Sequence, residues 1–474
     1  MLRKDRSKQD AVELVTYEML VPKDHLLRKV DEIVDFSFIY ELCAPLYCED
    51  NGRPAIDPEI LFRMLLVGYL YGIRSERRLE EEVNLNVAYK WFCKLGLTER
   101  APDHATFTAN RKRRFRDNNI AEKIFDEILR QAVSKGLVGG KIVYTDSTHV
   151  KANANKHKKT TATVEETPKA YMAALDEQIN RDREQLGKKP FDRDSDDNEP
   201  PTHAVQQSTT DPESGQLHKE GKPDGFHYSE HRTVDSKNNI IVNVHVTAAN
   251  INDVDPVAEI IQQVSARLGH MPEVMGLDAG YHCARVCKQL ADAGIQGVLG
   301  YRRHTHKGDH FGKYRFAYDP AENCYICPQK HRLRWKTTNR EGYREYWSDP
   351  DHCRNCPHRQ RCFSEKASRR LVTRHVWQEL LDMVDAYTKT PAGRLLYRWR
   401  KETIERSFAD AKQLHGLRFA RGRGVASMRE QSFLTAAAQN IKKMAKAASC
   451  SVSNFLLFIW FDKPLLAACA AGVC

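Results

Sequence analysis

Three acidic residues of this sequence stand at positions where their carboxylates could hold divalent metal ions. Asp146 closes the run Lys-Ile-Val-Tyr-Thr-Asp, which begins at residue 141, and Asp278 closes Glu-Val-Met-Gly-Leu-Asp, which begins at residue 273. Each aspartate follows a short apolar stretch, which predicts a buried strand that ends at the carboxylate. Carboxylates are preferred ligands of Mg²⁺. A pair of such ions can activate the attacking oxygen and stabilise the leaving oxygen when a phosphodiester is cut or transferred.

The third acid, Glu405, lies in a segment with helical spacing. At about 100° per residue, one narrow stripe of this helix holds Tyr397, Lys401, Glu405, Phe408 and Lys412. The stripe predicts a carboxylate between two ammonium groups that could hold DNA phosphates. The alternative is an amphipathic surface helix with an ordinary ladder of acids and bases. Each aspartate, taken alone, is likewise most simply interpreted as a helix cap or turn residue.

Composition limits the class of protein. The chain has 474 residues, of which 41% are hydrophobic and 29% charged, which is typical of a folded protein with more than one domain. Its formal net charge is +11, and its basic residues cluster, for example at 111–116, 156–159 and 398–401. Such clusters favour a polyanion such as nucleic acid, although any single cluster could be a solvated basic face.

The ends of the chain and its cysteines indicate a cytoplasmic protein that does not bind membranes. The first eight residues carry charges without an apolar core behind them, unlike a secretory signal. The apolar run 455–461 is too short to span a bilayer. Thirteen cysteines, an odd number, argue against a disulfide framework and leave metal binding or burial as their uses.

Residues 24–117 are predicted to be helical throughout. Asp57, Pro58 and Glu59 form a helix start, and Asp103 can cap a later helix. That later helix would expose a strongly basic face, made by Arg111, Arg113 and Arg114. The pattern resembles a helix-turn-helix, in which the last helix enters a DNA groove. A short solvated surface helix is the alternative.

From residue 141 the periodicity changes to that of strands. Residues 226–234 and 240–247 flank a turn-rich connector and predict a hairpin. A helix over 253–268, the Asp278 strand and a strand at 297–300 follow. This order predicts a mixed α/β sheet with flanking helices. The stretch 160–225, rich in Lys, Asp, Glu, Thr and Pro, predicts a disordered or loosely helical insertion.

Five cysteines lie in a segment of different composition, residues 301–375. Two Cys-x2-Cys pairs separated by 25 residues are typical of a zinc-ribbon-like module, since tetrahedral zinc takes its ligands from two tight turns. Reduced cysteines in a small insertion are the alternative, and Cys362, His352 and His358 leave the choice of the fourth ligand open. The candidate zinc cysteines are Cys324, Cys327, Cys353, Cys356 and Cys362.

Taken together, these motifs resemble those of the DDE transposases of bacterial insertion sequences, in the group with a Tyr-Arg-Glu-Lys signature and an RNase H-like or retroviral-integrase-like core. Residues 144–156 are similar to the first-aspartate motif, 276–281 to the second, and 405–412 with Gly416-Leu417-Arg418 and Arg421-Gly422 to the third. The helices around 52–54 and 65–77 are similar to an end-binding domain.

The chain departs from the signature of that group in one respect. The signature is Tyr-x2-Arg-x3-Glu-x6-Lys, and Glu405 with Lys412 fits its second half. Tyr397 and Arg400 each stand one residue too early for the first half, and Lys401 occupies the arginine position.

The resemblance implies a catalytic triad of Asp146, Asp278 and Glu405 that binds Mg²⁺ or Mn²⁺, with two ions expected. It implies cleavage of double-stranded DNA at the ends of a transposable element, followed by strand transfer into target DNA. Synapsis of two ends implies at least a dimer, in a bacterial cytoplasm and associated with the nucleoid. The DNA contacts that we expect near the triad are made by Tyr397, Arg400, Lys401 and Lys412.

Two alternatives remain for function: a catalytically inactive DNA-binding protein on the same scaffold, and a metal-dependent nuclease that cuts without joining. The predicted domains are a helical DNA-end-binding domain (1–120), the first part of the catalytic core (138–300), a Cys-rich insertion (301–375), the second part of the core (376–447) and a tail (448–474).

Overall fold

The computed structural model describes residues 12–48, 55–116, 118–165, 169–191, 202–218, 224–301 and 310–450. The expected tail and the acidic stretch 194–201 lie outside these residues, apart from the last turn of one helix. Among the described residues, no helix is both long enough and apolar enough to cross a membrane.

The amino-terminal part is helical, as predicted. Asp57 caps the longest helix of the part before residue 111 by accepting a hydrogen bond from Glu59 N, and Pro58 fills the first turn. Asp103 caps the last of these helices in the same way. The helices are α1 (Tyr17–Leu20), α2 (Leu26–Ile33), α3 (Phe38–Cys43), α4 (Pro58–Leu70), α5 (Glu76–Leu85), α6 (Val87–Phe92), α7 (His104–Asn110), a π-helix (Arg111–Arg116) and α8 (Ile120–Ser134).

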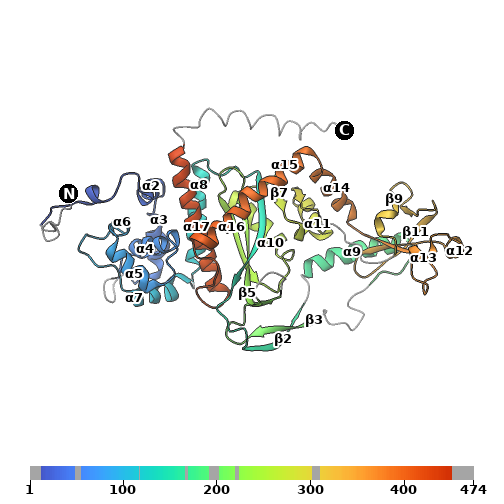
Figure 1. Ribbon diagram of the computed structural model, residues 1–474, viewed down its shortest axis with the longest axis horizontal. Helices are drawn as coiled ribbons and strands as arrows, with labels where there is room; N and C mark the ends of the chain where they lie inside the picture. Colours follow the sequence, from blue (N-terminus) through green and yellow to red (C-terminus); the bar gives the residue numbers. More distant parts are fainter. Residues whose placement is uncertain are drawn as a thin grey trace, which may run out of the picture.

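A mixed sheet forms the centre of the molecule (Figure 1). Its main part has the order β6-β5-β1-β7-β8, in which β1, β7 and β8 are parallel and β5 is antiparallel to β1 and β6. The predicted hairpin is therefore confirmed. The strands are β1 (Ile142–Lys151), β5 (Gly225–Asp235), β6 (Ile241–Ala248), β7 (Val274–Leu277) and β8 (Gln296–Leu299). Helices α10 (Val257–Leu268) and α11 (Ala284–Asp292) connect the later strands.

One long helix joins the sheet to the amino-terminal helices. Helix α17 (Val425–Cys450) packs on β6 and α8 and also contacts α2 and α4 (Figure 1). Side chains such as Phe433, Leu434 and Ile441 are buried in a cluster that runs from the helical part into the sheet. Burial of this apolar surface makes the two parts one continuous core.

The predicted disordered insertion differs from the structure wherever that segment is described. It forms β2 (Lys159–Glu165), α9 (Lys169–Gln185), β3 (Thr202–Ser208) and β4 (Gly215–Leu217). Strands β2 and β3 make an antiparallel arm that continues through β4 into β5. Helix α9 buries Leu175 and Ile179 against Trp377, and its Asp182 forms an ion pair with Arg344 at 2.7 Å. The polar composition predicted disorder because it gives no sign of these partners far along the chain.

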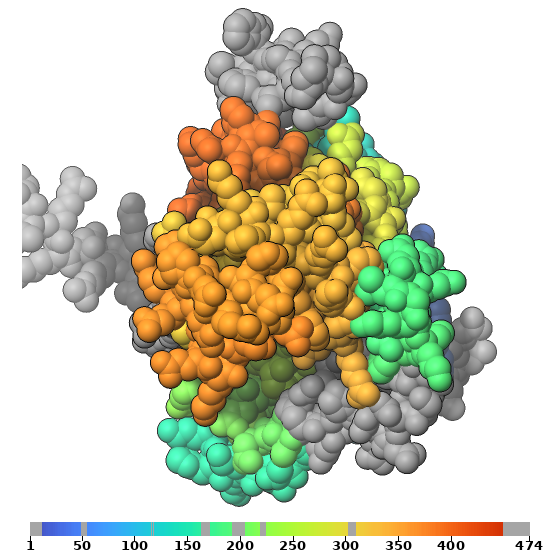
Figure 2. Space-filling view, turned by 90° about the vertical axis from the view of Figure 1, so that its right-hand side faces the viewer, coloured from blue at the N-terminus to red at the C-terminus, as the bar shows by residue number. Residues whose placement is uncertain are grey.

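The Cys-rich segment is a small antiparallel sheet with its own apolar centre, formed by residues such as Tyr325, Leu333 and Tyr346. It covers the face of the molecule in Figure 2, with α9 beside it. Its elements are β9 (Ala317–Asp319), β10 (Cys324–Ile326), β11 (Arg332–Thr338), β12 (Tyr343–Trp347), α12 (Pro350–Arg354), α13 (Arg359–Cys362) and β13 (Leu371–His375).

The segment around Glu405 is not one regular α-helix. After α14 (Gln378–Thr388) the chain forms α15 (Pro391–Arg400), a π-helix (Lys401–Glu405) and α16 (Arg406–Leu414). A π-helical turn contains more residues than an α-helical turn. The stripe predicted at about 100° per residue is therefore wrong for the residues before Glu405.

Candidate active site

The two aspartates lie side by side on neighbouring parallel strands. In the β1–β7 ladder Tyr144 is opposite Gly276, and the same offset, continued, places Asp146 opposite Asp278. Asp278 directly follows β7. Ligands of parallel sheets bind at this carboxyl-terminal edge. The prediction that Asp146 ends its strand is wrong, because β1 continues to Lys151 in antiparallel pairing with β5.

A close contact fixes the spacing of these strands. A Cβ atom on Gly276 would lie 2.4 Å from the Tyr144 ring, so the ring can pack directly against the backbone of β7 only because residue 276 is glycine. The Tyr144 hydroxyl donates a hydrogen bond to the carbonyl of Leu396 in α15, at 2.9 Å. This bond ties the helix that precedes Glu405 to the strand that carries Asp146.

Each aspartate also has a local structural role. Asp278 caps a short 3₁₀ helix by accepting a hydrogen bond from Gly280 N at 2.7 Å. Asp146 accepts one from Ser147 N at 2.8 Å. The cap or turn interpretation is therefore correct for Asp278 and wrong for Asp146, which lies within β1. In each carboxylate one oxygen makes the local bond, which leaves the second oxygen for other partners.

Arg400 connects two of the three acids. Its Nη1 lies 2.7 Å from Asp146 Oδ2, and its Nη2 lies 2.8 Å from Glu405 Oε1. The π-helix produces this contact, since i→i+5 winding brings residues five apart onto one face. Lys401, which was expected on that face, is exposed. The extra residue in the π turn also accounts for the early positions of Tyr397 and Arg400 in the signature.

Tyr397 packs at the end of the neighbouring strand. A Cβ atom on Gly300, just after β8, would lie 2.4 Å from the Tyr397 hydroxyl and 2.8 Å from Ala279 N. The Arg400 guanidinium lies 5.7 Å from the centre of the Tyr397 ring. Tyr397 therefore stands beside both the Asp278 turn and Arg400, even though it lies outside the predicted register.

The charges at this site are unbalanced. Burial, with the nearby Asp278 charge, raises the pKa of Asp146 from 3.8 to about 6, although Arg400 acts to lower it. Burial alone would lower the pKa of Arg400, but the charges of Asp146 and Glu405 raise it. The Asp146 side chain is 17% exposed and that of Arg400 only 11%. Asp146 and Glu405 contact one guanidinium and Asp278 lies near Asp146, so the site offers the oxygen ligands that a hard divalent cation takes, although these atoms do not all lie within 4.8 Å of one another.

Lys412, a predicted DNA contact, is half-buried. Its Nζ donates a hydrogen bond to Thr148 Oγ1 on β1 at 2.6 Å, and burial lowers its pKa. The charges of Glu230 and Arg232 act on Lys412, and these two residues form a fully buried ion pair with 2.5 Å between Arg232 Nη2 and Glu230 Oε1. The structure therefore gives Lys412 a partner on the strand that carries Asp146.

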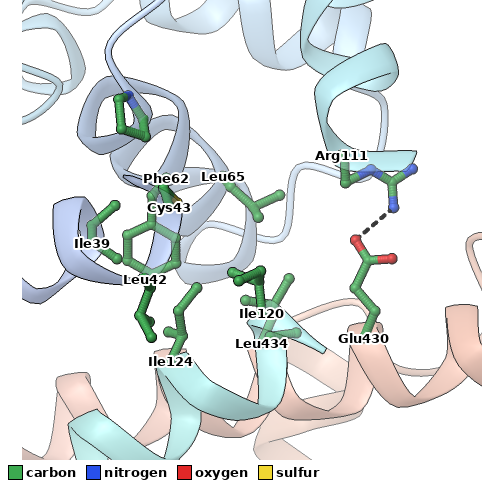
Figure 3. A pocket seen from close by; sticks show the side chains of 12 residues that line it. Ile39, Leu42, Cys43, Phe62, Leu65, Arg111, Ile120, Ile124, Glu430 and Leu434 are labelled. Atoms are coloured by element: carbon green, nitrogen blue, oxygen red, sulfur yellow. Dashed lines mark hydrogen bonds and ion pairs between the residues drawn. The ribbon is translucent and has the colours of Figure 1, made fainter. Parts of the chain in front are cut away.

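The basic run after α7 divides into paired and exposed residues. Arg111 contacts Glu76 at 2.8 Å and Glu430 of α17 at 3.0 Å, and Figure 3 shows this second pair. Arg116 contacts the same Glu430 at 2.8 Å. The Arg114 guanidinium lies 4.4 Å from the centre of the Tyr47 ring and also bonds Asn110, whereas Arg113 is exposed. Arg111 thus has intramolecular partners where a DNA contact was predicted.

Sequence reasoning did not find Glu430. It lies on α17, more than three hundred residues beyond Arg111, and its side chain is 6% exposed. A single glutamate in a long helix does not indicate, from sequence alone, that it pairs with an arginine so far away in the chain.

The structure separates the five candidate zinc cysteines into four and one. Cys327, Cys353, Cys356 and Cys362 line one pocket, together with His331, His352 and His358. Burial, with the neighbouring Cys353, Cys356 and Cys327, raises the pKa of Cys362 to about 11. Cys324 points elsewhere: it is buried on β10, where the charges beside it are those of Asp319, Glu322, Arg332 and Arg334.

Within the described residues, Glu80, Asp103 and His104 form the one group whose ligand atoms all lie within 4.8 Å of one another; the three acids and the four cysteines are not drawn together this closely. Asp103 caps α7, and Glu80 accepts hydrogen bonds from both the backbone and the ring of His104. These bonds account for the cluster as a link between α5 and α7.

Comparison with known proteins finds transposase sequence in two parts of the chain. Residues 15–113 match a family described as a transposase domain (DUF772), and residues 326–445 match a family described as a transposase DDE domain. The second match contains Glu405 but neither aspartate. Together the two matches cover the helical part and the carboxyl-terminal part of the fold.

A curated relative is the putative transposase for insertion sequence element IS402 of Burkholderia cepacia. It is 35% identical over 95 residues, which are 19% of this chain and 44% of that protein, less than half its length. The piggyBac transposase in a synaptic complex with hairpin DNA aligns with 94% of this chain and 77% of its own, at 9% identity and a TM-score of 0.34. The chain therefore carries two transposase-family domains, the second a DDE domain, and is distantly related to an insertion-sequence transposase.

Proposed function

We propose that this protein is a DDE transposase that cuts DNA at the ends of a mobile element and joins them to target DNA. The observation that carries the proposal is that Arg400 contacts both Asp146 and Glu405 at the edge of the sheet where Asp278 lies beside Asp146. The mixed sheet with its acids at this edge also supports the RNase H-like core expected from the resemblance.

Asp146, Asp278 and Glu405 would hold the metal. Two Mg²⁺ or Mn²⁺ ions, when bound, would supply activation of the attacking oxygen and stabilisation of the leaving oxygen. Asp146 offers the oxygen that Arg400 now contacts, and below about pH 6 it must first lose a proton to bind metal. Arg400, released from Asp146, would be placed to contact a DNA phosphate, for which its planar fork is suited.

We propose a second, structural metal in the Cys-rich sheet: zinc bound by Cys327, Cys353, Cys356 and Cys362. The connection between β10 and β11 supplies one tight turn, in which Lys330 N bonds the carbonyl of Cys327 at 2.8 Å. The end of α12 supplies a second turn, in which Cys356 N bonds the carbonyl of Cys353 at 3.3 Å. Four thiolates make a closed tetrahedral site.

Metal analysis of the purified chain tests this assignment. Replacing Cys362 by serine should remove the zinc, while Cys324→Ser should keep one zinc per chain. Zinc loss from Cys324→Ser with retention by Cys362→Ser would contradict it.

The substrate would be double-stranded DNA, both as element ends and as target, and synapsis would require at least a dimer. A cut-and-join assay tests the proposal: wild type and Asp146→Asn are incubated, with and without Mg²⁺, with duplex DNA that carries the sequences flanking the chain's own gene. Metal-dependent nicking and joining by the wild type alone is expected. Nicking without joined products would support the nuclease alternative, and binding without cutting by either protein would support the inactive DNA-binding alternative.

A further inference from the structure

A groove lies where the helical part, the end of β1 and the loop after α16 meet. We call residues 416–424, which follow α16, the arginine loop. The groove is lined from three sides by α4 and α5, by α7 with its π-helical extension, and by the arginine loop. The charged residues along it are Arg74, Glu76, Arg111, Lys112, Arg116, Arg421 and Arg423.

The arginine loop has a fixed backbone. Lys151 of β1 donates a hydrogen bond to the carbonyl of Arg418 at 3.2 Å and accepts one from Ala420 N at 2.8 Å. Gln431 of α17 accepts from Arg421 N and donates to the carbonyl of Phe419, at 2.8 and 3.0 Å. A loop held at both edges presents its side chains with little entropy left to lose on binding.

The acids of this region are already paired. Glu76 contacts Arg111, and Glu430, just outside the groove, contacts both Arg111 and Arg116. Four other cations along the groove have no carboxylate partner among the described residues: Arg74, Lys112, Arg421 and Arg423. The groove therefore carries an excess of positive charge that no part of the described chain balances.

Arg421 provides a second, independent sign of a ligand. Its guanidinium lies 4.0 Å from the centre of the Tyr69 ring, and its Nε and Nη2 atoms are buried without a hydrogen-bond partner. A buried donor without a partner costs free energy, more so when it is charged. An anion in the groove would satisfy these donors once the guanidinium turns toward it, and a guanidinium binds phosphate in bidentate fashion.

Strand β1 connects the groove to the candidate active site. Lys151, which holds the arginine loop, is five residues beyond Asp146 on the same strand. Five residues of strand span roughly 17 Å, the rise of about five base pairs of duplex DNA.

We propose that this groove binds the sugar-phosphate backbone of duplex DNA about five base pairs from the phosphate held at Asp146 and Asp278. Arg421 would contact a phosphate once its guanidinium turns from its buried position toward the groove, and Arg423, Arg74 and Lys112 would contact the neighbouring phosphates. The proposal rests on the proposed function for the position of the reacting phosphate, while the groove itself rests on its charge and on Arg421.

Salt-dependent binding tests the groove without any cutting. Affinity for a flanking-sequence duplex is measured by fluorescence anisotropy at several salt concentrations, in the absence of divalent metal, for wild type, Arg421→Gln and Arg423→Gln. Arg130→Gln, an exposed residue of α8 paired with Glu127, is the charge-matched control. Each groove variant should lower the salt slope by about 0.9 and weaken binding about eightfold at 0.1 M salt.

Slopes equal to that of Arg130→Gln in both groove variants would overturn the proposal, and a loss confined to single-stranded DNA would overturn the duplex assignment. Arg421 packs on Tyr69, so its variant could unfold; the exposed Arg423, whose Nε bonds only the Asn153 carbonyl, then decides. A wild type that never cuts, with lowered slopes in the variants, would refute the transposase proposal and leave the groove standing. If the wild type cuts DNA but the salt slopes of the variants are unchanged, the groove proposal is refuted and the transposase proposal stands.

Discussion

Replacing Asp146 by asparagine should make the protein more stable while removing its chemistry. Burial and Asp278 raise the pKa of Asp146 from 3.8 to about 6, so the fold disfavours the ionised carboxylate. This difference corresponds to roughly 3 kcal/mol at neutral pH, since each tenfold change in proton affinity is about 1.4 kcal/mol. Asparagine keeps the size and the acceptor oxygen without the charge, so a gain approaching this value is expected.

The gain should depend on pH in one direction. A raised pKa means that the protonated carboxyl stabilises the fold at low pH, and that this contribution is lost as the pH rises from about 4 to about 6. Asp146→Asn should therefore match the wild type near pH 4, exceed it progressively up to about pH 6 and keep a constant advantage above. Urea unfolding at several pH values measures the difference in unfolding free energy.

The matched control is Asp292→Asn, an exposed residue of α11 that pairs with Lys288. It should change stability by less than about 0.5 kcal/mol. An Asp146→Asn protein that is no more stable than wild type at neutral pH, or whose advantage does not vary with pH, would refute the electrostatic reasoning. Added Mg²⁺ should then stabilise the wild type more than the variant, because metal that binds only the folded state adds to its stability.

Three further perturbations follow from the geometry. The rate of DNA cutting should fall about tenfold per pH unit below pH 6 and level off above it, because Asp146 must be ionised to bind metal; a pH–rate profile measures this, and a flat profile down to about pH 5 would contradict it. Glu430→Gln should lower the free energy of unfolding in urea by about 3–5 kcal/mol, because Arg111 and Arg116 are largely buried and each would lose a carboxylate partner. A decrease of under about 0.5 kcal/mol would show that these ion pairs contribute little. Gly276→Ala should destabilise the fold by at least about 1–3 kcal/mol, because the new methyl would meet the Tyr144 ring at 2.4 Å; an unchanged thermal melting temperature would disprove that the contact is tight.

The sheet and its acids were predictable because their signals are local. Apolar runs of Val, Ile and Leu end at Asp146 and Asp278, and the connector after Val234 favours a hairpin. Strand periodicity and turn chemistry act over a few residues, so they can be recognised without knowledge of the fold. The helix starts at Asp57 and Asp103 follow the same rule, since a cap bonds only its own first turn.

The remaining features depend on partners far along the chain. The π turn at 401–405 consists of residues that could equally continue an α-helix, and its contact between Arg400 and Asp146 spans over 250 residues. The strands and helix of 160–225 likewise use distant partners, as Asp182 uses Arg344. Spacing alone made all five cysteines candidate zinc ligands, whereas the fold places Cys324 outside the pocket that the other four line.

A change of metal preference tests the central claim most directly. Asp146→Cys places a soft thiolate where a hard carboxylate stood, and thiolates bind Mg²⁺ poorly but accept softer ions such as Mn²⁺ better. We predict that this variant binds DNA but does not cut it with Mg²⁺, and that Mn²⁺ restores cutting. Cutting with Mg²⁺ at the rate of the wild type would contradict the claim that Asp146 holds the catalytic metal.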